Sequence, residues 1–447
     1  MKAICFMGLA ALACMCTSKK ETAPPPVALA QQILSDSSLQ KADAMGRKLL
    51  AEGFDAGSGY SQVWARDLNT FIEIALETKE SEEVRGALLV FFRMQQPNNE
   101  MVDGYKLKKE FSLKEDPNPY YSENDASHVG FKNTVETDQE TSLIQAVGKY
   151  VKKTKDRAFL QEAVAGKTVM QRMEMMIDYL MKNRFDKKYG LLWGAMTADW
   201  GDVQPSQKNP VDIDETTTPC IDVYDNAMMV LALKEMADLS RDEDTKKWQA
   251  LRSKFSARIR KHLWDSANGK FIPHIYLEKS PIPQDFDESK VYYHGGTAIA
   301  IEAGLLSAEE VALSNKKMRE NVKASGAPTI GLTLYPVYPQ DFFPCGMCNP
   351  YVYQNGGDWT WFGGRMIQQL VRYNMAQEAY DEIRPMVDLV IKNNDFYEWY
   401  EVNGKAAGSA RFKGSAGALC KAIQMLNEWA GAQLMVNEAP HVPPISH

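Results

Sequence analysis

Residues 221–237 read IDVYDNAMMVLALKEMA, and this stretch decides the fold class. Its apolar side chains return every three or four residues, at Val223, Tyr224, Ala227, Met228, Leu231 and Met236. That spacing places them on one face of an α-helix. Residues 157–183 repeat the pattern, again with many methionines. Such stripes are typical of a helical core rather than of a cofactor site.

Helical spacing also dominates the rest of the chain. Further helices are expected at about 28–51, 66–79, 81–95, 137–153, 242–263, 294–304, 307–323, 359–375, 377–393 and 414–432. Together they make about twelve helices, most of them in consecutive hairpins. Strand signals are few and short, with the best at 269–277 and 329–337.

The connections alternate in length. Those within a helix pair are short, whereas those between pairs are long and rich in Gly, Pro, Asn and aromatic residues: 96–135, 184–220, 265–293, 324–358 and 394–413. Long loops in a compact chain commonly carry function. A ring of hairpins gathers such loops on one face. We therefore predict an all-α toroid of helical hairpins whose long loops carry a few short strands on one face.

Acidic residues lie beside tryptophan in four of these loop or helix-entry segments. The segments contain Trp64, Arg66 and Asp67; Asp199, Trp200 and Asp202; Asp358, Trp359 and Trp361; and Glu398, Trp399 and Glu401. An indole face suits the C–H face of a sugar ring, and a carboxylate beside it can grip hydroxyls or move protons. Trp264-Asp265 and Glu428-Trp429 have the same adjacency in charged helical stretches, where a surface role is favoured.

Composition excludes several classes of protein. The 447 residues carry a net charge of -7, with no basic footprint for nucleic acid. The chain contains no P-loop, dinucleotide fingerprint or serine-nucleophile elbow. We expect neither an obligatory metal ion nor an organic cofactor, and the oligomeric state is left open. Residues 28–434 are expected to form the functional domain and 435–447 a C-terminal tail.

The N-terminus has the features of a targeting segment. Lys2 precedes an apolar run, 3–13, which is too short to cross a bilayer as a helix. The run ends Ala11-Leu-Ala-Cys14, which resembles the lipobox of bacterial lipoproteins. The resemblance implies a signal peptide over 1–13, an acylated Cys14 and a flexible tether over 14–27. The protein is then exported and held by lipid at the periplasmic or cell-surface side of the outer membrane. A plain secretory peptide is the alternative.

The remaining cysteines give a weaker signal. Of seven in the chain, Cys345 and Cys348 have the CxxC spacing. No second such pair or histidine cluster accompanies them, which disfavours structural zinc. A local disulfide or two inert thiols is favoured over a redox site.

The motifs, taken in order, resemble those of the (α/α)6-barrel glycosidases. This clan includes glucoamylases, trehalases, processing α-glucosidases and cellobiose-type phosphorylases. The resemblance runs from about residue 50 to 432. It rests on Trp64-Ala-Arg-Asp67, Asp199-Trp-Gly-Asp202, Gln354-Asn-Gly-Gly-Asp-Trp359 and Tyr397-Glu-Trp-Tyr400 with Ser415-Ala-Gly417. It implies an (α/α)6 toroid of six hairpins.

The resemblance also implies catalytic roles. Asp199-Trp-Gly-Asp202 is similar to the Asp-Trp-Asn-Asp of cellobiose-type phosphorylases, whose second aspartate is the general acid; this points to Asp202. Trehalases carry Trp-Asp directly adjacent, and the inserted Gly201 leaves Asp199 as the fallback acid. Glu398-Trp-Tyr resembles the Glu-Lys-Tyr of trehalases, whose glutamate is the general base. This favours Glu398 over Glu401.

Further residues are expected to bind substrate. They are Trp64, Arg66, Asp67, Asp138, Trp193, Asp199, Trp200, His294, Gln354, Asn355, Asp358, Trp359, Trp361 and Glu401. Several have structural alternatives: Arg66 and Asp67 as a buried ion pair, Asp138 within a capping box of Thr137 and Glu140, and His294 as a structural residue. Asp202 in a turn and Glu401 at the surface are likewise open alternatives.

The leading functional prediction is an inverting, exo-acting glycoside hydrolase acting on an oligosaccharide, with an acid/base carboxyl pair. A phosphorylase of the same clan would use phosphate in place of water and would need no protein base. A sugar epimerase or polysaccharide lyase on the same toroid would depend on His, or on Tyr and Arg. A noncatalytic glycan-binding lipoprotein would keep the tryptophans without a poised carboxyl pair.

Overall fold

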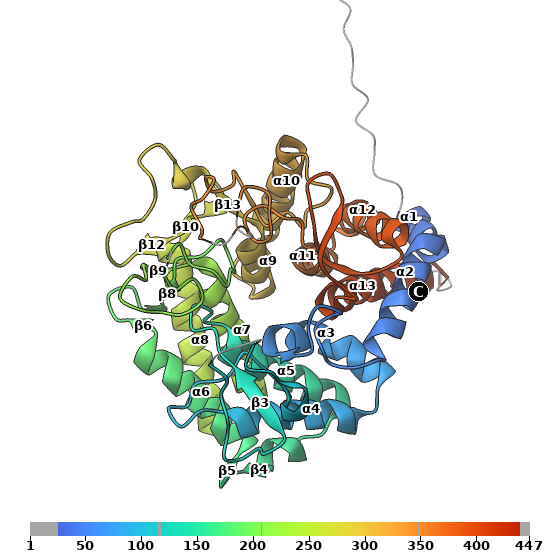
Figure 1. Cartoon of the computed structure of the whole chain (residues 1–447). Coiled ribbons are helices and arrows are strands. Elements are labelled where there is room, and N and C mark those ends of the chain that lie inside the picture. Colours follow the sequence, from blue (N-terminus) through green and yellow to red (C-terminus); the bar gives the residue numbers. More distant parts are fainter. Residues whose placement is uncertain (1–25, 115–117, 207, 345, 347–348, 439–447) are drawn as a thin grey trace, which may run out of the picture.

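A closed ring of inner helices forms the centre of the molecule (Figure 1). The computed structural model describes residues 26–114, 118–206, 208–344, 346 and 349–438. Within these residues the inner helices are α3 (Ala65–Thr78), α5 (Gln139–Thr154), α7 (Val223–Leu239), α9 (His294–Glu302), α11 (Thr360–Arg372) and α13 (Lys413–Glu438). Each packs against the next, and α13 packs against α3, which closes the ring.

A second layer of helices surrounds this ring. It consists of α1 (Pro26–Ser35), α2 (Ser37–Leu50), α4 (Ser81–Met94), α6 (Val169–Asn183), α8 (Asp242–His262), α10 (Ala308–Ser325) and α12 (Ala376–Asn393). Inner α7 is buried on nearly every side, Asn226 included, whereas outer α8 buries only Trp248, Phe255 and Ile259. This contrast is the one expected between a central and a surface helix. The predicted all-α ring of hairpins is confirmed.

Short strands occupy the loops, as predicted. One sheet joins β1 (Val63–Trp64), β2 (Gly104–Leu107) and β3 (His128–Phe131); another joins β8 (Gly194–Ala195), β9 (Pro219–Ile221) and β12 (Ile275–Tyr276). Two-stranded pairs are β4 (Ala163–Val164) with β5 (Lys167–Thr168), β6 (Phe185–Asp186) with β7 (Leu191–Leu192), β10 (Trp264–Asp265) with β11 (Lys270–Phe271), β13 (Tyr292–Tyr293) with β14 (Leu334–Tyr335), and β15 (Tyr397–Tyr400) with β16 (Ala406–Ala410). The two segments predicted as strands contain β11, β12 and β14.

Two helix predictions need correction. The helix expected at 28–51 is two helices, because the Asp36 side chain accepts hydrogen bonds from the amides of Ser38 and Leu39 and starts α2. The helix expected at 157–183 begins only at Val169. Before it the chain turns through the β4–β5 hairpin, where Ala165 and Gly166 have φ of 48° and 77°. A run of apolar spacing does not reveal such a turn.

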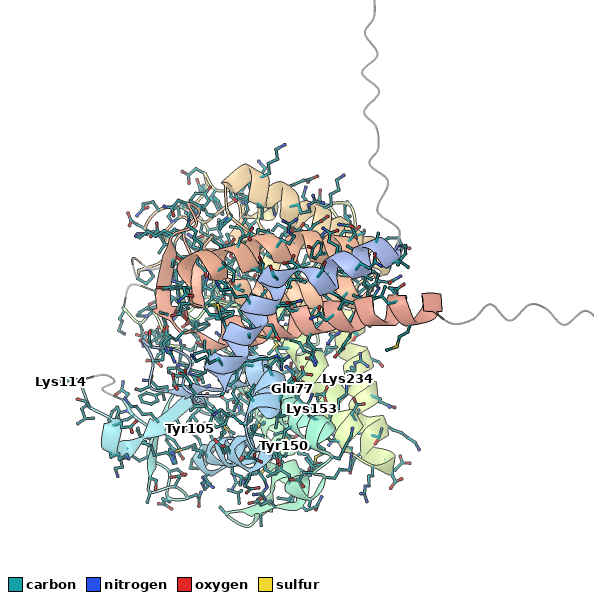
Figure 2. All side chains as sticks on the ribbon, turned by 90° about the vertical axis from the view of Figure 1, so that its right-hand side faces the viewer. Glu77, Tyr105, Lys114, Tyr150, Lys153 and Lys234 are labelled. Atoms are coloured by element: carbon teal, nitrogen blue, oxygen red, sulfur yellow. The ribbon has the colours of Figure 1, made fainter. Side chains whose placement is uncertain are left out.

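The polarity of the helices gives the ring two different ends. The long connections all precede inner helices, so they gather at the end where the inner helices start; we call this end the loop mouth. Figure 2 shows the ring from the side, with Lys114 at the loop mouth and the start of α1 and end of α13 toward the other end. No helix among the described residues is long and apolar enough to cross a membrane.

Several predictions fall outside the described residues. These are the signal peptide, the acylated Cys14 and the tether up to residue 25, most of the C-terminal tail, and the pair Cys345 and Cys348. Cys220 and Cys420, which are described, are buried free thiols.

Candidate active site

A cavity of about 230 Å³ opens at the loop mouth. Its described lining comprises Tyr60, Trp64, Arg66, Asp67, Asp103, Asn133, Glu136, Gln139, Trp200, Asp202, Tyr353, Trp359, Trp361, Glu398 and Phe412. These side chains come from five of the six connections that lead into the inner helices, or from the helix starts that follow. The ring therefore assembles one cavity from segments that are far apart in sequence.

Glu398 enters this cavity from β15 with both carboxylate oxygens hydrogen-bonded. Tyr60 Oη donates to Oε1 at 2.8 Å, and the Ser409 amide donates to Oε2 at 2.8 Å. Gly408 has φ of 67°, and a Cβ there would lie 2.5 Å from Oε2, so the hairpin needs glycine at this position. Burial raises the pKa of Glu398, while the two donors oppose that rise by stabilising the charged form.

Asp202 lines the same cavity, and its carboxyl group is held more loosely by hydrogen bonds. Its Oδ2 accepts a long hydrogen bond of 3.3 Å from Tyr353 Oη, and its buried Oδ1 has no hydrogen-bond partner among the described residues. Burial raises the pKa of Asp202, and Arg66 opposes the rise. Burial raises the pKa of both carboxyl groups, and they differ in their hydrogen bonds: Glu398 accepts two of 2.8 Å, and Asp202 accepts one of 3.3 Å.

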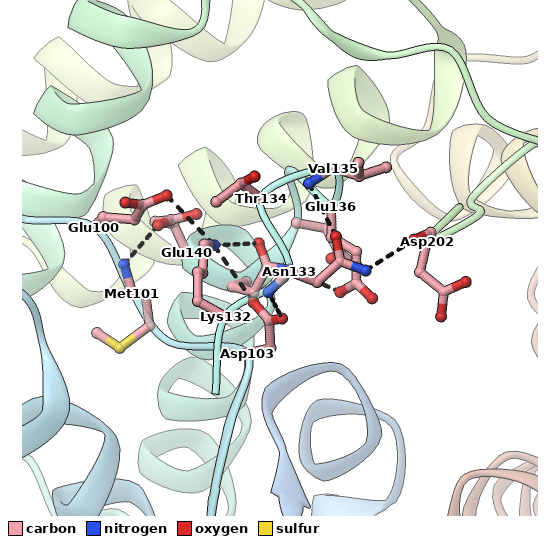
Figure 3. Close-up of polar contacts among 12 residues, drawn as sticks. Glu100, Met101, Asp103, Lys132, Asn133, Thr134, Val135, Glu136, Glu140 and Asp202 are labelled. Atoms are coloured by element: carbon pink, nitrogen blue, oxygen red, sulfur yellow. Dashed lines mark hydrogen bonds and ion pairs between the residues drawn. The ribbon is translucent and has the colours of Figure 1, made fainter. Parts of the chain in front are cut away.

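The backbone of Asp202 is held from two sides. Its amide donates to Gln354 Oε1 at 3.2 Å. Its carbonyl accepts from Asn133 Nδ2 at 2.8 Å, a contact shown in Figure 3. Asn133 also accepts a hydrogen bond from the Val135 amide at 2.9 Å. The loop before α5 thus fixes the position of the loop that carries Asp202.

Arg66 is the one basic side chain among the described residues that line the cavity. Its Nε and Nη2 donate to the two carboxylate oxygens of Asp138 at 2.7 and 2.9 Å, and Nη2 lies 2.9 Å from Glu136 Oε2. Its guanidinium carbon lies 5.8 Å from the ring centroids of both Trp200 and Trp361. Its positive charge is therefore neutralised by neighbouring carboxylates within the protein.

Asp138 itself stands behind Arg66 rather than in the cavity. It also accepts a hydrogen bond of 2.6 Å from Tyr224 Oη. It is the N-cap residue of α5 by position, but its side chain makes no capping bond. Glu140 accepts from the Met101 amide at 2.8 Å, so the capping box with Thr137 does not form.

Carboxyl groups are the commonest charged groups of the described cavity lining. Besides Asp202 and Glu398, it contains Asp67, Asp103 and Glu136. Burial raises the pKa of Asp67 and of Asp103 to about 7 each. Lys132, next to the cavity, lies 3.4 Å from Asp103 Oδ1 and is likewise balanced by acids (Figure 3). The cavity is consequently acidic, with no free cation among its described lining residues.

Aromatic rings complete the wall. Trp200 packs edge-on against Trp359 and Trp361, with ring centroids 4.7 and 5.3 Å apart. Trp64 and Phe412 contribute further apolar surface. Flat rings next to carboxyl groups match the two faces of a sugar, which are apolar C–H and polar hydroxyl.

Asp199 lies outside the cavity lining and contacts the first turn of helix α9. It adopts φ of 57° and is 2% exposed. Its carboxylate accepts hydrogen bonds of 2.9 and 3.1 Å from the Gly296 amide in the first turn of α9. The left-handed backbone turns this side chain toward α9, which anchors the loop that bears Asp202.

Asp358 and His294 also have structural surroundings. The Asp358 carboxylate binds the amide and hydroxyl of Thr329, each at 2.7 Å. His294 is 1% exposed, with Nδ1 3.3 Å from the Ile330 carbonyl and Nε2 3.1 Å from Asn321 Nδ2. Burial lowers the pKa of His294 to about 4. Neither residue lines the cavity.

Four more predicted residues are placed away from it. Trp193 packs on Arg184 at 5.0 Å, and Gln354 contacts Asp202 through the backbone amide described above. Asn355 accepts from the Tyr338 amide at 2.8 Å. Glu401 is partly exposed and pairs with Lys405 at 3.0 Å. The cavity thus gathers Trp64, Arg66, Asp67, Trp200, Asp202, Trp359, Trp361 and Glu398 of the predicted residues.

Seven lining residues are not among the site residues predicted from the sequence. They are Tyr60, Asp103, Asn133, Glu136, Gln139, Tyr353 and Phe412. Two of them could have been found from their position in the sequence: Tyr353 immediately precedes Gln354, and Glu136 lies in the segment of Asp138. Tyr60 reaches Glu398 only through the fold. No group of three or more His, Cys, Asp or Glu able to hold a metal ion occurs in the described parts of the chain.

Comparisons with known proteins identify the fold. No family model matches the chain, and no curated protein sequence matches it. A GH63 mannosylglycerate hydrolase from Thermus thermophilus, solved in complex with glucose, superimposes with a TM-score of 0.59 at 15% identity, over 89% of this chain and 99% of that one. A rhamnosidase from Klebsiella oxytoca with rhamnose bound gives 0.57 at 13%, over 86% of this chain and 63% of that one. The chain has the (α/α)6 fold of these glycosidases.

Proposed function

We propose that the protein is a glycoside hydrolase that releases one sugar from the nonreducing end of an oligosaccharide, with Asp202 as general acid and Glu398 as general base. One observation carries the proposal. Two carboxyl groups from distant loops line one aromatic-walled cavity, and they differ in their hydrogen bonds. The solved structures of similar fold, named as glycosidases and containing glucose or rhamnose, support the same class of activity.

The chemistry follows from that difference. Asp202 donates its proton to the glycosidic oxygen, and the leaving sugar departs as an alcohol. Glu398 removes a proton from a water molecule, whose oxygen attacks the anomeric carbon from the opposite face. The released sugar carries the inverted anomeric configuration. Tyr60 and the Ser409 amide keep Glu398 charged for this role, and burial keeps the proton on Asp202.

The size of the cavity favours a terminal sugar. Its volume of about 230 Å³ corresponds to roughly eight molecules of liquid water at about 30 Å³ each. That space suits one pyranose ring, and this supports the proposed exo-acting cleavage.

The alternatives fit the cavity less well. A phosphorylase would need a free cation for phosphate, but Arg66, the basic residue of the described lining, is bound to Asp138 and Glu136. An epimerase or lyase would draw on histidine, and none is among the described lining residues. Tyr60 and Tyr353 are hydrogen-bonded to the carboxyl pair. Hydrolysis by an acid/base carboxyl pair needs neither a free cation nor a histidine.

A panel of disaccharides and aryl glycosides tests the proposal. The wild type is compared with Asp202→Asn, Glu398→Gln and the control Glu401→Gln, and the product anomer is read by NMR. We expect turnover of a disaccharide with inversion by the wild type and the control, and loss by the other two. Full activity in both cavity variants would reject the assignment, and retention of configuration would reject the mechanism.

We also propose export and acylation at Cys14, on the lipobox resemblance alone. In a Gram-negative host, the wild type is expected in the detergent-soluble membrane fraction, with a mass increase from the acyl chains. Cys14→Ser should lose both properties. A wild-type protein that is cleaved and soluble would instead support a plain secretory peptide.

A further inference from the structure

A second and larger cavity lies at the opposite end of the ring from the loop mouth. Its volume is about 610 Å³. Side chains from all six inner helices face it: Thr70, Glu73, Lys149, Lys152, Lys153, Lys155, Leu231, Lys234, Glu235, Glu302, Arg365, Gln368, Arg372, Lys421, Gln424 and Glu428. Eight of these described residues are basic and four are acidic. We call this end the basic mouth.

Helix ends account for only part of this charge. The C-terminus of a helix carries about half a negative charge, which favours cations in its last turn. Lys152 and Lys153, at the end of α5, fit that explanation. Lys234, Arg365 and Lys421 do not, because each lies more than a turn before the end of its helix. Their side chains bring positive charge to the inner helices, each one beside a carboxylate partner.

Internal pairing leaves a positive excess. Glu302 pairs with Arg365 at 2.9 Å, and Glu73 pairs with Lys421 at 3.1 Å. Lys149, Lys152, Lys155 and Arg372 have no carboxylate within 4.0 Å among the described residues. Lys149 donates to the Asn69 carbonyl and Arg372 to Gln369, both neutral acceptors.

The field of these cations reaches the buried acids. Burial alone raises the pKa of Glu302, yet Arg365, Arg372 and Lys149 lower it to about 2. The pKa of Glu73 is lowered in the same way against the effect of burial, by Lys149, Lys421 and Arg372. Glu302 and Glu73 thus favour their charged form, and the cations around the cavity still outnumber the carboxylates.

We propose that the basic mouth binds a phosphate group, either free or as a phosphate ester. A dianionic, tetrahedral group offers acceptors to several cations at once, and arginine forks bind it through paired hydrogen bonds. Arg372, at the end of α11, lines the cavity with no carboxylate within 4.0 Å among the described residues, whereas Arg365, two turns earlier, is paired with Glu302. The acidic cavity of the loop mouth provides no comparable place for an anion.

The phosphate has two conceivable sources, a soluble compound or a lipid headgroup. The start of α1 and the end of α13 lie toward the basic mouth, as do Lys153 and Lys234 (Figure 2). A lipid anchor attached before α1 would hold this end near the membrane surface. Free phosphate and anionic lipid are therefore separate arms of one experiment.

The experiment uses the full chain with Cys14→Ser, so that no acyl chain contributes to vesicle binding. One arm titrates inorganic phosphate and pyrophosphate by calorimetry. The other measures co-sedimentation with vesicles of phosphatidylglycerol and with vesicles of phosphatidylcholine. The test variant combines Lys152→Gln with Arg372→Gln, both exposed. The control combines Lys254→Gln with Arg258→Gln, an exposed Lys–Arg pair on outer α8.

We expect saturable binding in at least one arm, weakened by salt. The test variant should raise the dissociation constant tenfold or more, and the control should leave it unchanged. Binding of phosphate points to a soluble ligand; binding only to phosphatidylglycerol points to the headgroup. Lack of binding in both arms, or equal binding by both variants, overturns the proposal. Lys155→Asn serves as a second variant, since asparagine tolerates its φ of 64°. The readout is independent of hydrolysis.

Discussion

The two ends of the ring are built on the same six inner helices but carry opposite charge. The described lining at the loop mouth has five carboxyl groups and one arginine; at the basic mouth it has eight basic residues and four glutamates. Inner helices begin at the loop mouth and end at the other, so their partial charges favour acids at the first and cations at the second. The direction of the helices therefore favours acidic side chains at one end and basic side chains at the other, independently of the loops.

The two ends also differ in how their charges are held. At the loop mouth, carboxyl groups are fixed by loop contacts, as Glu398 is by Tyr60 and Ser409. At the basic mouth, charges on neighbouring helices pair directly, as Glu302 does with Arg365. Changes at the first end should alter the chemistry, and changes at the second should alter stability.

The largest effect is expected from Asp202→Asn. Loss of the general acid should lower kcat on a disaccharide by about 10³-fold. Aryl glycosides with acidic phenols need little protonation of the leaving oxygen and should lose much less. Glu398→Gln should lower kcat by a similar factor on the disaccharide and on the aryl glycosides. Steady-state kinetics over a series of phenols measures the difference; an equal loss on all substrates in Asp202→Asn would contradict its role as acid.

The next effect lies at the other end of the ring. Glu302→Gln leaves Arg365 buried without its counter-charge, which should cost about 3–5 kcal/mol of unfolding free energy. The folded fraction should keep its kcat. Urea unfolding and kinetics on the same sample measure both quantities. The double variant with Arg365→Met should recover much of the stability, and a loss of kcat without loss of stability would break the contrast between the two ends.

Asp199 offers an intermediate case, because it belongs to the loop mouth but acts on a helix. Asp199→Ala removes the acceptor for the Gly296 amide and strains a left-handed backbone, so a loss of about 2–3 kcal/mol is expected. Asp199→Asn keeps an acceptor and tolerates that backbone, and should stay close to wild type in kcat. If Asp199 were the acid, Asp199→Asn would lose as much kcat as Asp202→Asn.

Tyr60→Phe should have the smallest effect. Tyr60 donates to Glu398 and lowers its pKa, so removing the hydroxyl raises that pKa. The base then protonates at higher pH, and the acid limb of the kcat/KM profile should move up by about one pH unit. Kinetics from about pH 4 to 8 test this shift. An acid limb at the same pH as in the wild type would show that Tyr60 does not affect the pKa of Glu398.

The sequence predicted the ring well because its signal is periodic and local. The pattern at 221–237 is inner helix α7, and long loops marked the end that holds the cavity. It predicted single side chains less well. Asp199 and Asp202 share one motif, yet φ of 57° at Asp199 turns the first toward α9 while the second lines the cavity. Composition and adjacency give residue type but not the direction of a side chain.

Closure of the ring has a consequence for the order of folding. Helix α13 packs against α1, α2, α3 and α11, so the ring stays open until this last described helix has been made. Tyr60 meets Glu398 across 338 positions of sequence. Contacts of such range form slowly, because a long loop must close first. During synthesis the growing chain therefore carries its stacked hairpins without a finished cavity, and the proposed hydrolytic activity should arrive in one late step.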